Sequence, residues 1–296
     1  MNGSYDYKEA ATYLDSRIRE APLTDRQQKA MQLCDPPSYQ VYATEGVDSY
    51  RLRDASNMDG TEALFRIRGI LCQKYLPPIH DLKGCPPVAF MKQQVLLTTF
   101  KPGTEFQRYL EILPDFFNMF ERLLPGEVTM PRVQAYGEHP ALLFYNPYFS
   151  HIRATRNLKT LNLLSTIDPR GILAKNKPQH VHYTEDNKVA YMREQRDEGG
   201  VVRTMTTNPS RFQNGDVVEV VFSFVAFPTK NKSFHVALAL RELVLLDDTF
   251  RMKSEIGLQK ATMPVLPLKR DRVYGDTDEE TESRKEIIRK AFWANF

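Results

Sequence analysis

The sequence of 296 residues has few cysteines and lacks the short glycine motifs that bind nucleotides or present a nucleophile. Its three cysteines, Cys34, Cys72 and Cys85, are widely spaced and odd in number. This argues against a disulfide framework and against a cysteine zinc site. The sequence contains no Gly-x-x-x-x-Gly-Lys phosphate loop, no Gly-x-Gly-x-x-Gly turn and no Gly-x-Ser-x-Gly elbow. These absences favour a protein without enzymatic activity and predict no cofactor.

Long apolar runs and a strong excess of one charge are also missing. No run reaches the roughly 18 apolar residues that cross a bilayer, and the first 21 residues carry charges throughout, unlike a secretory signal. The formal net charge is only +3, whereas proteins dedicated to duplex DNA usually show a larger basic excess. We therefore expect a soluble intracellular protein, in the nucleus or the cytoplasm, with no membrane partner and with cations gathered in a local patch.

The most informative stretch is residues 215–246. Two long runs rich in Val, Phe and Leu flank a short polar tip at residues 228–233, and this composition predicts two antiparallel strands of a hairpin. Because nearly every position in both runs is apolar, we expect the hairpin to be buried on both faces or to close a barrel. Glu219 and Ser223 are the polar exceptions in the first run, and their spacing predicts that they mark its wetter face.

This stretch resembles the last hairpin of phage-type single-stranded-DNA-binding proteins. The shared features are a Gly-Asp opener at Gly215, a long strand with aromatics, a Lys/Asn tip and a returning strand that ends in an apolar-Asp step. The resemblance covers about a tenth of the chain and implies an OB-fold, a small Greek-key barrel. The GDVVEV opener and the long return strand also resemble proteins found in many copies in mushroom-forming fungi, a resemblance that implies no activity.

The remaining patterns predict helices around a strand-rich core. Apolar spacing predicts helical structure over residues 4–34, with a second start at Thr24, and one helix over residues 104–124 that Pro114 kinks or splits. Short strands are expected at residues 39–42, 50–53, 64–75 and 94–100. The predicted fold class is α+β, with a β-rich, barrel-like (OB-like) core and peripheral helices. The predicted segments are 1–127 (helices, short strands and the aromatic helix), 128–250 (the OB-like domain) and 251–296 (an extended, acidic and amphipathic tail).

Cations occur beside aromatic residues in several of these segments. Single-stranded nucleic acid needs both kinds of side chain, because cations pair with phosphates and aromatic faces stack on bases. The sequence therefore predicts non-enzymatic binding of single-stranded nucleic acid, in replication, repair or a mobile-element setting. The candidate binding residues are Arg66, Arg68, Tyr145, Tyr148, Arg153, Arg156, Lys159, Phe227, Lys230, Lys232 and Phe234.

Two other functions remain open from the sequence. His180 and His182 would share one face of a strand, and with Glu185 they are similar to the first metal motif of cupins, although the spacing to the glutamate is shorter and the opening glycines are missing. The chain would then be a metal-dependent enzyme. Alternatively, residues 284–296 form an amphipathic helix with Phe292, Trp293 and Phe296 that docks on a protein partner.

Overall fold

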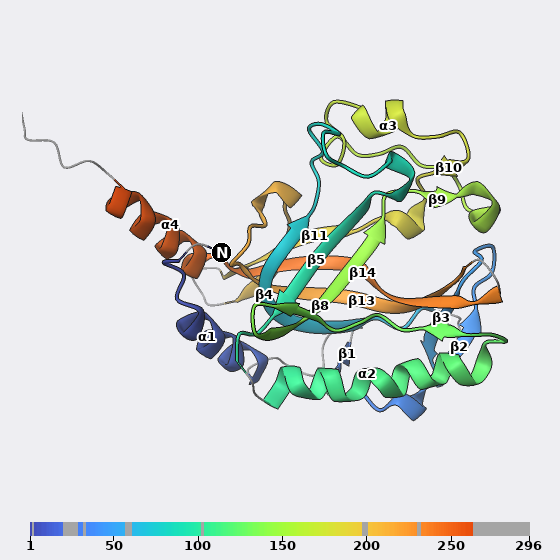
Figure 1. The fold of residues 1–296 in the computed structure, drawn as a ribbon, viewed down its shortest axis with the longest axis horizontal. Helices are drawn as coiled ribbons and strands as arrows, with labels where there is room; N and C mark the ends of the chain where they lie inside the picture. The colour runs from blue at the N-terminus through green and yellow to red at the C-terminus, as the bar shows by residue number, and fades with distance from the viewer. Residues whose placement is uncertain are drawn as a thin grey trace, which may run out of the picture. The chain divides into compact units, whose positions relative to one another are not determined.

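The computed structural model describes residues 1, 3–19, 29–31, 34–56, 61–101, 104–196, 201–229 and 232–262. Residues Met1–Leu258 form one compact unit and Gln259–Phe296 a second one. The helices are α1 (Tyr7–Arg19), α2 (Thr104–Leu123), α3 (Ile172–Asn176) and α4 (Thr249–Thr262). The strands, drawn in Figure 1, are β1 (Lys29–Ala30), β2 (Tyr39–Ala43), β3 (Tyr50–Asp54), β4 (Phe65–Tyr75), β5 (Lys92–Thr98), β6 (Val128–Thr129), β7 (Gln134–Tyr136), β8 (His139–Pro147), β9 (Ser150–His151), β10 (Val181–His182), β11 (Ala190–Arg196), β12 (Val202–Thr206), β13 (Val217–Pro228) and β14 (Phe234–Asp247).

The long strands pair into a closed ring. Along the sheet the order is β14, β8, β5, β4 and β13, and β13 pairs back with β14. The strands β11 and β12 extend the sheet beyond β14, while β3 and β2 extend it beyond β13. The combination of this sheet with helices confirms the predicted α+β class. The predicted division into three segments stays a prediction.

The hairpin expected at residues 215–246 is confirmed. Strands β13 and β14 are antiparallel, and their register runs from Val217 opposite Asp247 to Pro228 opposite Phe234. The first ten residues of β13 are all buried, so this strand is covered on both faces, as its composition predicted. On its other edge β13 pairs with β4 and β3, which places the hairpin in the middle of the sheet.

Two polar positions inside β13 are buried, although the sequence predicted that they mark a wetter face. Glu219 is 1% exposed, and its carboxylate accepts a hydrogen bond from Arg68 Nε at 2.7 Å and lies 3.7 Å from Arg66 Nη1. Ser223 is fully buried and accepts a hydrogen bond from Arg241 Nε at 3.0 Å. The prediction was wrong because charged partners from other strands satisfy both side chains, and a partnered polar group can be buried.

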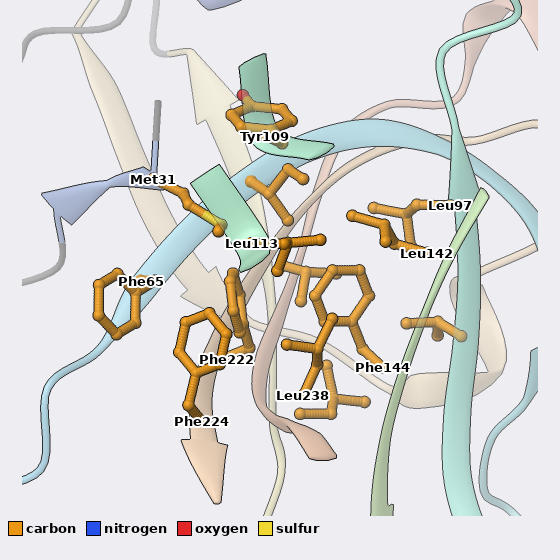
Figure 2. Packing of buried hydrophobic residues seen from close by; sticks show 14 of the residues in the cluster. Met31, Phe65, Leu97, Tyr109, Leu113, Leu142, Phe144, Phe222, Phe224 and Leu238 are labelled. Carbon is orange, nitrogen blue, oxygen red and sulfur yellow. The ribbon is translucent and has the colours of Figure 1, made fainter. Parts of the chain in front are cut away.

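Helix α2 packs its aromatic face against the inner side of the ring. The rings of Phe116 in α2 and Phe224 in β13 stack with their centroids 4.9 Å apart. Figure 2 shows Phe65, Phe222 and Phe224 close together in this core, with Phe144 from β8 beside them. Burying side chains of this size contributes about 1.5–3 kcal/mol each, which makes this cluster the main source of stability in the first unit.

Pro114 lies inside α2 but does not split it, contrary to one of the two outcomes predicted from the sequence. The helix runs without a break from Thr104 to Leu123. Proline removes one helical hydrogen bond and costs about 3 kcal/mol in a helix interior, but Leu113 and Phe117 are both buried and hold the two halves in one core. Among the described helices, none is long and apolar enough to cross a membrane.

The N-terminal prediction was correct only in its first part. Helix α1 covers Tyr7–Arg19 as expected, whereas the second helix start at Thr24 lies outside the described residues. Lys29–Ala30, predicted to be helical, is a short strand that pairs in parallel with the beginning of β4. Pairing with an available sheet edge overrides the weak local helical preference of so short a segment.

The residue directly before β13, Asp216, carries a buried carboxyl group. Its Oδ1 accepts a hydrogen bond from Arg251 Nε at 2.6 Å, and its Oδ2 accepts one from the backbone N–H of Gln213 at 2.7 Å. Burial nevertheless raises the pKa of Asp216 to about 6, because the loss of hydration outweighs the favourable charge of Arg251. The folded state therefore prefers the protonated carboxyl group between pH 4 and pH 6.

This preference predicts a pH-dependent stability difference between the wild type and Asp216→Asn. A carboxyl group whose pKa is raised on folding contributes stability at low pH, and that contribution is lost as the pH rises through the folded-state pKa of about 6. From pH 4 to pH 7 the wild type should lose roughly 2–2.5 kcal/mol relative to the variant, from a shift of about two pKa units. Urea unfolding of both proteins across this range measures the difference; a relative gain by the wild type would show that the pair with Arg251 dominates instead.

Candidate nucleic-acid interface

A lysine lies directly over a partly exposed aromatic ring on the outer face of the sheet. Tyr145 in β8 is paired with Gln94 in β5, and Lys92 begins β5 two residues earlier, so both side chains share one face. Lys92 Nζ lies 3.7 Å from the centroid of the Tyr145 ring, and both residues are partly exposed. Partial burial lowers the pKa of Lys92. The pair places a cation and an aromatic ring together where a ligand can reach them.

Two further aromatic side chains lie on the same face of the neighbouring hairpin. Phe227 in β13 is opposite His235 in β14, and Ala239 in β14 is paired with Tyr145. Because alternate residues of a strand share a face, His235 and Ala239 point to the side that carries Tyr145. Burial, together with the nearby charge of Lys92, lowers the pKa of His235, so its ring is uncharged near neutral pH. We call Lys92, Tyr145, Phe227 and His235 the Tyr145 face.

Three of the predicted cations lie on the surface in one short segment. Arg153, Arg156 and Lys159 are all exposed. Their backbone is fixed at two points, since the His151 ring accepts a hydrogen bond from the N–H of Arg153 and the carbonyl of Ala154 accepts one from Asp48 at 2.7 Å. The three exposed cations are therefore carried by a backbone whose position is fixed by hydrogen bonds.

The tip of the hairpin carries one more exposed cation. Lys232 is exposed and has a positive φ of 58°, while Lys230 lies outside the described residues. The tip is anchored to the loop between α2 and β6, because the N–H of Phe234 donates to the carbonyl of Glu127 at 2.8 Å. A Cβ atom at Gly126 would lie 2.1 Å from the carbonyl oxygen of Lys232, so only glycine permits this close approach.

Arg66 and Arg68, predicted to face a ligand, are buried. They are 3% and 6% exposed and surround the carboxylate of Glu219. Arg68 also donates a hydrogen bond to the backbone carbonyl of Arg17 at the end of α1. The alternation in β4 predicted that both cations share a face, but it could not show that α1 and β13 cover that face. These two side chains are not available at the surface.

Tyr148 and Phe234 are also buried rather than exposed. Tyr148 has no exposed area and lies in a separate core cluster beneath α3. Phe234 is 8% exposed and packs edge-on against Tyr50, with ring centroids 5.6 Å apart. Of the predicted aromatic residues, Tyr145 and Phe227 are therefore the two that reach the surface.

Four charged side chains form a closed ring of ion pairs next to the Tyr145 face, which we call the four-charge ring. Arg51 in β3 contacts Glu62 at 3.1 Å and Asp186 at 2.7 Å, and Arg241 in β14 contacts the same two carboxylates at 2.9 and 3.1 Å. The two arginines hold the pKa of Asp186 below its ordinary value against the effect of burial. The four-charge ring holds the turn at Glu185–Asn187 against the sheet.

The predicted metal ligands do not converge. His182 is buried, burial lowers its pKa, and its two ring nitrogens lie 2.5 and 2.8 Å from the hydroxyls of Thr155 and Thr160. His180 is exposed, and the Glu185 carboxylate pairs with Lys188 at 2.6 Å. Within the described part of the chain, no group of three or more His, Cys, Asp or Glu side chains is placed to hold a metal ion. The donor geometry gives the metal-dependent alternative no support.

The sequence did not identify the Lys92–Tyr145 pair. The two residues belong to different strands, and only the register between β5 and β8 brings them together. A signal was present, since a lysine opens one strand and a tyrosine lies near the end of another, but such single residues are common in exposed strands.

No family model matches the chain, and no curated protein matches it. Four chains among solved structures do match. One is the crystal structure of gp2.5, a single-stranded DNA binding protein encoded by bacteriophage T7, with 11% sequence identity and a TM-score of 0.35 over 71% of this chain and 100% of that chain. This likeness is weak and concerns the fold alone. None of the comparisons supports the resemblance to fungal proteins.

Proposed function

We propose that the protein binds single-stranded nucleic acid on the Tyr145 face. The observation that carries this proposal is the position of Lys92 Nζ, 3.7 Å from the centroid of the partly exposed Tyr145 ring. Phe227 and His235 extend the aromatic surface on the same side of the hairpin. Unpaired bases expose their faces and can stack on such rings, whereas the bases of a duplex stack on one another.

Exposed cations in the segment that follows β9 and at the hairpin tip would neutralise the phosphates of the nucleic-acid strand. Arg153, Arg156 and Lys159 supply three positive charges from one fixed segment, and Lys232 supplies another at the hairpin tip. The low net charge of the whole chain is compatible with such a local patch. We also infer that the ring of β4, β5, β8, β13 and β14 is an OB-like barrel, a fold that commonly binds strands on its outer face.

Tyr145→Ala should weaken binding to an unstructured oligonucleotide by about 5- to 150-fold, because one stacked base contributes about 1–3 kcal/mol. Fluorescence anisotropy with a labelled single strand measures the loss. Tyr145→Phe keeps the ring and should bind almost as the wild type does. Tyr7→Ala removes an exposed tyrosine from α1 and serves as the matched control. Equal affinities of Tyr145→Ala and the wild type would contradict the proposed face.

The cations should act differently from the aromatic ring. Arg156→Ala together with Lys159→Ala should reduce the slope of log affinity against log salt by about 1.4, since each phosphate contact to a single strand contributes about 0.7. Tyr145→Ala should leave this slope unchanged. Absence of binding to any single strand at low salt would remove the proposal altogether.

A cellular setting in replication, repair or a mobile element remains part of this proposal. The other candidate function, docking of a protein partner through residues 284–296, concerns a segment outside the described residues. It stays a prediction from the sequence.

A further inference from the structure

A cavity of about 620 Å³ lies beside the four-charge ring. It is bounded by the segment from Leu161 to Ile167, by the beginning of β11 and by the end of β12. Its volume falls within the range of about 300–1,000 Å³ that is typical of pockets for small organic ligands. Its apolar walls are formed by Leu161, Leu164, Ile167, Val189, Met192 and Pro209.

The charged side chains that line this cavity are already paired with partners. Arg241 contacts both Glu62 and Asp186, and Glu185 contacts Lys188. A charged ligand would have to compete with these pairs, and it would also lose its own hydration. The cavity is therefore suited to a neutral group with large apolar faces.

A buried hydroxyl group in the wall has no hydrogen-bond partner. Tyr183 lines the cavity and is 2% exposed, and its hydroxyl is buried without a partner among the described residues. Burial raises the pKa of Tyr183 to about 12, so the group remains a hydrogen-bond donor at neutral pH. A buried donor without a partner costs about 1–3 kcal/mol.

The cavity lies close to both parts of the proposed interface. The N–H of Leu161 donates to the carbonyl of Tyr183 at 2.8 Å, so the exposed cations at Arg156 and Lys159 lead directly into the cavity wall. On the other side, Arg241 follows Ala239 by two residues in β14, and Ala239 is paired with Tyr145. Two residues of a strand span about 7 Å, so the backbone of Arg241 in the cavity wall lies about that far along β14 from the residue paired with Tyr145.

We propose that this cavity receives one unpaired base of the bound strand. A base is flat, uncharged at neutral pH and rich in acceptor atoms, and it is attached to phosphates that the neighbouring cations can neutralise. The inference rests on the proposed function and adds to it a second binding element that differs from stacking on the open Tyr145 face.

Photochemical cross-linking tests the cavity without requiring a fixed register of the strand. The probe is an oligothymidylate with 4-thiothymine at every position, and the adducts are located by mass spectrometry. We expect adducts at Tyr183, Tyr191 or Met192 in addition to Tyr145. Adducts confined to the Tyr145 face would overturn the inference and leave the proposed function intact, whereas absence of any binding would remove both.

Two variants fill the cavity from positions whose side chains are exposed. Ala190→Trp in β11 and Thr206→Trp in β12 should each abolish the cavity adducts and lower affinity by about 5- to 150-fold, the range for one base. The adduct at Tyr145 should persist, which shows that the variant is folded and binds. If both variants fill the cavity, remain folded and keep full affinity with unchanged adducts, the base does not enter there.

Discussion

Glu219→Ala is expected to lower the free energy of unfolding by about 3–5 kcal/mol. Glu219 is 1% exposed, and its carboxylate is the negative group between two buried guanidinium groups, those of Arg66 and Arg68. Removing one partner of a buried ion pair leaves the other charge in a medium that solvates it poorly. Here two cations are affected by a single substitution, so the upper part of this range is expected.

Urea unfolding followed by circular dichroism measures this loss. Glu121→Ala is the matched control, because Glu121 is an exposed residue of α2, and it should change the stability by less than about 0.5 kcal/mol. A triple replacement of Glu219, Arg66 and Arg68 by apolar residues should recover much of the stability. A loss of under about 1 kcal/mol for Glu219→Ala would contradict the buried pairing.

Asp186→Ala is expected to destabilise the protein by a similar amount, about 3–5 kcal/mol, for a related reason. Asp186 contacts Arg51 at 2.7 Å and Arg241 at 3.1 Å, and the four charges of the ring are mostly buried. Without Asp186, the single carboxylate of Glu62 would face two guanidinium groups. The turn at Glu185–Asn187 would also lose its side-chain contact with Arg51 of β3, while the backbone carbonyl of residue 186 would keep its hydrogen bond from Arg241.

The neighbouring Glu185 provides a sharp control for this prediction. Its side chain is exposed and pairs with the exposed Lys188, and surface pairs of this kind contribute about 0–1 kcal/mol. In thermal unfolding, Asp186→Ala should therefore lose much more stability than Glu185→Ala, although the two residues are adjacent in the sequence. Equal effects of Asp186→Ala and Glu185→Ala would show that the ring contributes no more than a surface pair. Asp186 contacts Arg51 and Arg241, whereas Glu219 contacts Arg66 and Arg68, so the double variant should be close to additive.

The sequence predicted well those helices and strands whose apolar residues follow a clear pattern over a long stretch of chain. The hairpin of β13 and β14 and the aromatic helix α2 follow from apolar runs that fit a strand or a helix over ten residues or more. The short strand β1 was missed, because two residues carry almost no periodic signal and its pairing partner lies in β4.

The candidate site was only partly predictable, because exposure depends on elements far away in the chain. Arg66 and Arg153 look alike in the sequence as cations near aromatic residues, yet one is buried beside Glu219 and the other is exposed. Similarly, Tyr148 and Tyr145 differ by three positions, but the first lies in a core and the second on the surface. Whether such a side chain is exposed depends on which distant helices and strands pack over it. A local sequence pattern carries no information about those elements.

The pairing of Arg68 with Glu219 has a consequence for the newly made chain. The two residues are 151 positions apart, and β4 acquires its neighbour β13 only after that length has been synthesised. At roughly 5–20 residues per second, the ribosome needs about 8–30 s to cover this interval. During that time Arg66 and Arg68 of β4 lack their buried carboxylate partner, and the strand edge that β13 will cover is unpaired. The nascent chain should therefore depend on chaperones until the hairpin of β13 and β14 has left the ribosome.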